Sequence, residues 1–115
     1  MKNKKLSQLI NRNPILHYGA DDDLSDAAIF RMFLYYRNRV EMKNGIMLFC
    51  NGEKTIIRYL YWQDKAPHLG RKYFPLGKIP WPLTSEDYST WSEEKHGQFM
   101  QCIFCPIIEE DECNH

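Results

Sequence analysis

The sequence predicts an α+β fold in which a small antiparallel sheet packs against one long helix. First, Asn51-Gly52 separates two apolar, β-prone runs, residues 46–50 and 53–62. Asn-Gly in this setting favours a two-residue hairpin turn, because both central residues of a type I′ turn need φ > 0. Second, residues 24–43 carry apolar side chains at helical spacing. The predicted order is helix, helix, strand, strand, arm, helix, strand.

Length and composition indicate a single domain spanning residues 1–115, with 43% hydrophobic and 26% charged residues. Fifteen basic residues balance fifteen acidic ones, so the whole chain has no net charge to attract a polyanion. No apolar run is long enough to span a membrane, and the amino terminus lacks a signal-peptide core, so we expect a cytoplasmic protein with no membrane partner. Because the cytoplasm is reducing, we expect the four cysteines to be thiols or metal ligands instead of disulfides.

Residues 1–13 predict a short first helix, because Leu6, Leu9 and Ile10 share helical spacing and Pro14 ends the pattern. We expect residues 15–20 to form a connector.

The long helix is predicted over residues 24–43. Asp23 is its expected N-cap, and Asn44-Gly45 its expected C-terminal end. The apolar stripe is wider than one core face requires. We therefore expect a second packing partner, either another helix or a second copy of the chain in a homodimer through helix 24–43.

The hairpin 46–62 is expected to pair its strands across a two-residue turn. In that register the opposed residues on one face are Cys50 with Glu53, Leu48 with Thr55, and Ile46 with Ile57. Neither face of the hairpin is purely polar, which indicates a sheet that is covered on one side and partly covered on the other.

Residues 63–83 break all periodicity with four prolines and two glycines, and we interpret them as a long ordered arm. Thr84 is the predicted N-cap of a helix over residues 85–95, which Gly97 closes. Residues 98–104 are predicted to add a third antiparallel strand to the hairpin, and 106–115 to form an acidic tail.

The arm mixes cations with aromatic rings. Trp, Tyr and Arg are common energetic anchors of protein interfaces, whereas cations alternating with rings also suit single-stranded nucleic acid. A third interpretation is that the rings only pin the arm to the body. We predict partner contacts by six side chains: Arg71, Lys72, Tyr73, Phe74, Lys78 and Trp81.

Four residues near the carboxy terminus could bind zinc: Cys102, Cys105, Cys113 and His115. Two thiolates separated by two residues can grip one tetrahedral ion, which needs four nitrogen or sulfur donors. The alternative is that the cysteines near 102–105 are small buried residues of a strand.

No catalytic constellation or phosphate-binding glycine loop is present, so we expect no enzymatic activity. The predicted function is a small non-enzymatic binding protein that modulates or inhibits a macromolecular partner by steric blockade through arm 63–83; we expect that partner to be a protein, with nucleic acid as the alternative. The alternative is a zinc-stabilised nucleic-acid-binding module that uses the terminal Cys/His cluster, and elemental analysis of the purified protein separates the two.

Overall fold

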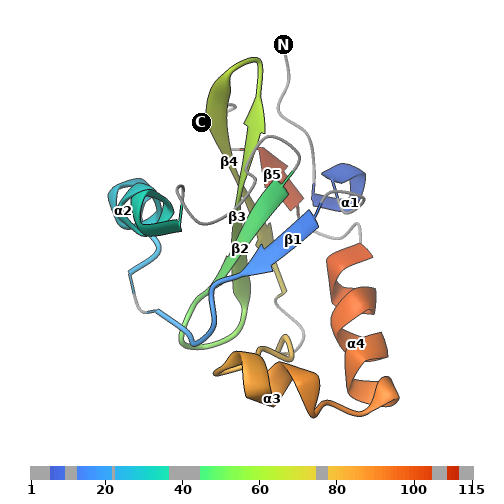
Figure 1. The fold of residues 1–115 in the computed structure, drawn as a ribbon. Helices are drawn as coiled ribbons and strands as arrows, with labels where there is room; N and C mark the ends of the chain where they lie inside the picture. Colours follow the sequence, from blue (N-terminus) through green and yellow to red (C-terminus); the bar gives the residue numbers. More distant parts are fainter. Residues whose placement is uncertain are drawn as a thin grey trace.

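A mixed β-sheet forms the centre of the structure, and helices cover both of its faces (Figure 1). This computed structural model describes residues 6–9, 13–21, 23–36, 45–74, 78–104 and 109–111, and it confirms the predicted α+β class. The elements are α1 (Leu6–Leu9), β1 (Asn13–Leu16), α2 (Asp26–Tyr36), β2 (Gly45–Cys50), β3 (Ile56–Gln63), β4 (Ala66–Tyr73), α3 (Ser85–Ser89), α4 (Glu93–Phe104) and β5 (Glu109–Asp111).

The strands lie in the sheet in their order along the chain. β1 pairs with β2 in parallel, and every other neighbouring pair is antiparallel. β1 replaces part of the connector predicted at 15–20. Pro14 did not exclude it, because β1 is an edge strand, and an edge strand tolerates a residue that cannot donate a hydrogen bond.

The hairpin predicted at Asn51-Gly52 is confirmed, but its connection is longer than two residues. Cys50 pairs with Ile57 instead of Glu53, a shift of four residues. The Asn51 side chain explains the longer loop, because its Oδ1 accepts hydrogen bonds from the backbone nitrogens of Thr55 (2.8 Å) and Ile56 (2.9 Å). An even shift keeps the paired side chains on their predicted faces of the sheet, while residues 53–55 lie in the connection.

One face of the sheet is covered by α2, as predicted. Ile29 and Phe33 of the helix are buried against four residues of the strands, Met47, Phe49, Leu60 and Leu69. The described helix begins at Asp26, and residues 37–44 of the predicted helix lie outside the described residues. Gly45 belongs to β2 and is not a helix cap.

The N-cap of α2 is Ser25 and not Asp23. The Ser25 Oγ accepts a hydrogen bond from the Ala28 nitrogen at 3.3 Å, which is the N-cap geometry. Asp23 lies two residues earlier, where its Oδ1 accepts from the Ser25 nitrogen at 3.0 Å. Hydrogen bonds from Ser25 are the main cause of the lowered pKa of the Asp23 carboxyl.

The other face is covered by α1, α4 and the segment around Trp81. Here the prediction of a strand at residues 98–104 is wrong, because these residues form the end of α4. Phe99 and Ile103 are four residues apart, so one helix face places both in the core. The predicted helix 85–95 is also two helices, α3 and α4, and Gly97 lies inside the second.

The arm predicted at 63–83 is partly regular, because residues 66–73 form β4 between β3 and β5. Pro67 pairs near the β3–β4 turn, and Gly70 lies opposite Tyr59. A Cβ atom at residue 70 would overlap the Tyr59 ring, so glycine is required for this close approach. Within the predicted tail 106–115, residues 109–111 form β5, and the rest lies outside the described residues.

Candidate partner-binding site

The end of the arm, residues 78–83, is anchored at several points. The Trp81 indole nitrogen donates to the carbonyl oxygens of His17 (3.2 Å) and Gly19 (3.0 Å). The Gly19 nitrogen donates to the Pro82 oxygen at 3.0 Å, and the Ile79 nitrogen to the Lys54 oxygen at 2.8 Å. A segment held at three positions has little conformational freedom left to lose on binding.

The six predicted contact residues do not form one surface. Lys72 and Trp81 are 0% and 4% exposed, so their side chains belong to the interior. Arg71 and Tyr73 lie on the sheet face that α2 covers, where Arg71 Nη1 donates to the Tyr73 hydroxyl at 2.8 Å. They alternate with Lys72 along β4, and neighbouring strand residues point to opposite faces.

Phe74 and Lys78 lie on the α4 side of the sheet. With Pro80 they line a hollow of about 380 Å³, whose other wall is formed by three α4 residues, Gln98, Gln101 and Cys102. Phe74 is half-buried there, and Lys78 is exposed. Partner binding by Arg71, Tyr73, Phe74 and Lys78 stays a prediction.

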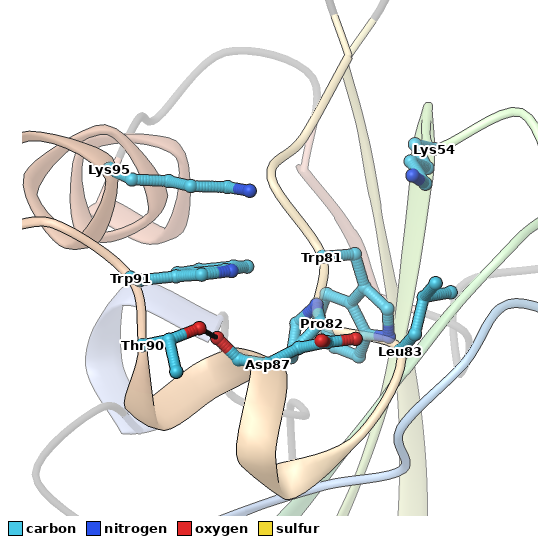
Figure 2. A pocket seen from close by; sticks show the side chains of 8 residues that line it. All are labelled: Lys54, Trp81, Pro82, Leu83, Asp87, Thr90, Trp91 and Lys95. Carbon is cyan, nitrogen blue, oxygen red and sulfur yellow. Dashed lines mark hydrogen bonds between the residues drawn. The ribbon is translucent and has the colours of Figure 1, made fainter.

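A second hollow, of about 270 Å³, is also lined by residues of the anchored segment (Figure 2). We call it the lysine–tryptophan hollow and define it by its lining residues Lys54, Trp81, Pro82, Leu83, Asp87, Thr90, Trp91 and Lys95. Figure 2 shows the Lys95 side chain extended above the Trp91 ring, with Lys54 across the hollow. The Lys95 Nζ lies 4.6 Å from the centre of the Trp91 ring, within the range of a cation–π contact.

Lys54 reaches this hollow from the β2–β3 loop. Its φ of +61° is left-handed, a conformation that persists at a residue with a side chain only where the surroundings fix it. The Lys54 nitrogen donates to the Asn51 oxygen at 3.0 Å, and its own oxygen accepts from Ile79. The loop that Asn51 organises therefore sets the backbone position from which the Lys54 side chain extends to the hollow.

Trp91 and Lys95 are placed by the start of α4. Ser92 is the N-cap, since its Oγ accepts from the Lys95 nitrogen at 3.2 Å. Trp91, one residue earlier, contacts the His96 ring with centres 5.5 Å apart, which resembles a hydrophobic staple across the helix start. Trp91 also contacts Tyr88 and Phe99. The Trp91 ring is therefore fixed from several sides.

The hollow has more positive than negative charge. Within the described residues neither Lys54 nor Lys95 has a carboxylate within ion-pair distance. Asp87 also lines the hollow, and its backbone nitrogen donates to Thr84 Oγ1 at 3.1 Å, which confirms Thr84 as the N-cap of α3. Burial, and secondarily the nearby Tyr18, raises the pKa of the adjoining Tyr88 phenol.

Exposed apolar side chains border this site. Leu83 is 62% exposed, and Tyr18 precedes Gly19, whose nitrogen bonds to Pro82. Sequence reasoning missed Lys54, Trp91 and Lys95. The available signal was the four-residue spacing of Trp91 and Lys95, which would have made them neighbours on the surface of the predicted helix 85–95; in the structure Trp91 precedes α4.

The zinc site also stays a prediction. Cys102 lies half-buried on α4, and Cys105, Cys113 and His115 lie outside the described residues. Across the described ranges, no three His, Cys, Asp or Glu side chains come together in a group that could hold a metal ion.

The predicted self-association face lies on α2, where Leu34 and Tyr35 are 53% and 59% exposed. A homodimer through this helix stays a prediction. None of the helices in the part of the chain that the structure describes has the length and apolar character needed to cross a membrane.

Comparison with protein-family models, with curated proteins and with solved structures found no match to this chain. The fold and site therefore define it only as an α+β protein with a five-stranded mixed sheet.

Proposed function

We propose that the protein is a non-enzymatic binding protein that regulates or inhibits a protein partner by covering part of its surface. The contact surface is the anchored segment 78–83 with the lysine–tryptophan hollow. The observation that carries this proposal is that the most exposed large apolar side chain of the described residues, Leu83, lies on a segment fixed by the Trp81 hydrogen bonds.

A fixed segment suits steric blockade. Because its backbone is already held at Gly19 and Lys54, binding does not have to order the segment. The smaller loss of conformational entropy makes binding tighter. Leu83 and Tyr18 offer apolar area, and the neighbouring Trp91 and Lys95 offer an aromatic ring and a cation. Tryptophan and tyrosine supply a large share of the energy in protein interfaces.

The proposal is tested with a photo-crosslinking amino acid at residue 83, in a lysate of the source cells with and without nuclease treatment. The expected product joins this protein to one other protein, and excess unlabelled protein suppresses it. A Leu83→Glu variant should compete poorly, because a carboxylate would replace the exposed apolar side chain. The matched control is the same crosslinker at Arg31, which is exposed on α2.

Three outcomes overturn the proposal. They are the absence of a product at residue 83, the same product at residue 31, and loss of the product on nuclease treatment. The last outcome would instead favour nucleic acid as the partner.

A further inference from the structure

We infer that the lysine–tryptophan hollow receives a carboxylate side chain, Asp or Glu, from an acidic and apolar segment of the protein partner. This inference rests on the proposed function and adds the chemistry that the partner must present. It involves binding only, with no bond made or broken.

The charge of the hollow carries the first step. Lys54 and Lys95 approach it from two different elements, the β2–β3 loop and α4. Neither has a carboxylate partner among the described residues. Two ammonium groups facing one space repel each other, and an anion between them would relieve that repulsion and accept hydrogen bonds from both.

The balance of charges selects the anion. Asp87 lines the same hollow, so two cations are offset by one carboxylate, and the surplus is a single positive charge. A single carboxylate matches that surplus. A nucleic-acid backbone would bring several phosphates, and its binding depends on many cations acting together. Its phosphates would also be repelled by the Asp87 carboxylate.

The size of the hollow selects the kind of ligand. At about 270 Å³ it falls just below the range of about 300–1,000 Å³ that is typical of sites for drug-sized ligands and cofactors. It suits one side chain of a larger partner. Leu83 and Pro82 line the hollow beside the lysines, so an apolar residue next to the acidic one would have a surface to contact.

The backbone of Lys54 and the side chain of Lys95 are also held in place. Lys54 has its backbone fixed by Asn51 and Ile79, and Lys95 lies over the Trp91 ring. Lysine side chains normally lose considerable rotamer freedom when they bind a ligand. For Lys95 part of that freedom is already lost over the Trp91 ring, which favours a specific contact over a diffuse electrostatic one.

The test is selection from a phage-displayed library of random peptides on the full chain. The expected peptides share an Asp or Glu next to an apolar residue. A selected peptide is then synthesised with its acidic residue and with the corresponding amide, and binding is followed by tryptophan fluorescence. The amide should bind about tenfold more weakly, since a hydrogen bond to a charged group is worth about that factor.

Variants of the protein give the matching evidence. Lys95→Met, on an exposed helix surface, and Lys54→Met should each weaken binding of the acidic peptide. Binding of the amide peptide should not change. Lys65→Met is the matched control, because Lys65 is exposed and has a φ of +64°, close to that of Lys54. The Lys65→Met variant should bind the acidic peptide as tightly as the unchanged protein does.

The inference is overturned if no peptide is selected, if the selected peptides lack a carboxylate, or if the Lys54 and Lys95 variants bind like the control. Tight binding of inorganic phosphate or of a single-stranded oligonucleotide, displaced by neither peptide, would also overturn it. Failure of the peptide test with a positive crosslink at residue 83 removes this inference and leaves the proposed function standing. A negative crosslink removes both.

Discussion

Among the residues that the structure describes, each face of the sheet contains one buried cation, and the two are satisfied in different ways. Arg58, 1% exposed, lies on the α2 face. It donates from Nη1 to the Leu24 oxygen at 2.7 Å and from Nη2 to the Asp26 carboxylate at 3.0 Å. Lys72, 0% exposed, lies on the opposite face and donates from Nζ to the Ile103 oxygen at 2.8 Å.

The two contacts fix opposite ends of the two helices. Arg58 reaches the beginning of α2, where Asp26 is itself favoured by the positive end of the helix dipole. Lys72 reaches the last turn of α4, where backbone carbonyls have no partner within the helix. The Asp26 side chain is 66% exposed, whereas the Lys72 contact is buried. The α4 contact is thus the one sheltered from water.

The two ends of α4 are therefore held by different kinds of contact. Its carboxyl end is held to the sheet by a buried charge-assisted hydrogen bond. Its amino end, which carries Lys95 and adjoins Trp91, is held by ring contacts with Tyr88 and Phe99. The candidate site therefore lies at the end of the helix that apolar packing positions.

The largest effect is expected from removing the apolar core on either face. Ile29→Ala on the α2 face and Ile103→Ala on the α4 face should each lower the free energy of unfolding by about 2–5 kcal/mol, because both side chains are fully buried. Urea unfolding measures both. Gln101→Ala, exposed on α4, is the control and should change stability by less than about 0.5 kcal/mol. A cost below about 1 kcal/mol for Ile103→Ala would show that α4 does not complete the core.

A smaller effect is expected where the α4 face is tightest. Gly70→Ala should destabilise the fold by about 1–3 kcal/mol, because the added methyl group overlaps the fully buried Tyr59 ring. In a Tyr59→Leu background the same substitution should have much less effect, since the clash is removed. A double-mutant cycle measures this coupling. Additive costs would show that some other contact constrains Gly70.

The sequence predicted the hairpin and its faces because that information is local. Ile46, Leu48 and Cys50 share one face because side chains alternate along a strand. Asn51 marks the turn. The register was wrong because the Asn51 side chain binds the backbone of Thr55 and Ile56, a contact that the dipeptide pattern does not specify.

The remaining differences depend on packing between distant segments. The apolar residues of 98–104 suit a strand as well as a helix, and the buried pair Phe99 and Ile103 decides between them only once the sheet is present. β4 was missed because Gly70 weakens a strand pattern, and its role emerges only opposite Tyr59. The lysine–tryptophan hollow combines residues of three separate segments, so no local pattern could have revealed it.

The two buried cations themselves provide a direct test of the comparison. Lys72→Met should destabilise the fold by about 1–3 kcal/mol, because it leaves the Ile103 carbonyl unpaired in a buried position. Arg58→Met should cost about 0.5–1.5 kcal/mol, because water can reach the exposed Asp26 carboxylate and the part-buried Leu24 oxygen that it leaves behind, and its contact with the Gly70 oxygen is long, at 3.4 Å. Thermal and urea unfolding measure both. An equal or reversed order would contradict the conclusion that the α4 contact is the better sheltered one.

Hydrogen exchange locates the effect of each variant. Lys72→Met should increase exchange mainly in the last turns of α4, and Arg58→Met mainly in the first turn of α2. Uniform changes across both helices would show that neither cation acts locally.

The smallest effect concerns Cys50, which belongs to the core on the α4 face. Burial raises the pKa of its thiol from 9.0 to about 12, and Lys54 and the Asn51 backbone only partly oppose this. The unfolded thiol loses its proton above pH 9.0, while the folded one keeps it up to about pH 12. The thiol's contribution to stability is therefore complete below pH 9 and is lost as the pH rises toward 12. Between pH 8 and pH 10 the unchanged protein should lose about 1 kcal/mol more than Cys50→Ala, in which other titrating groups are retained. Urea unfolding at the two pH values measures the difference, and equal losses would mean that water reaches the Cys50 end of β2.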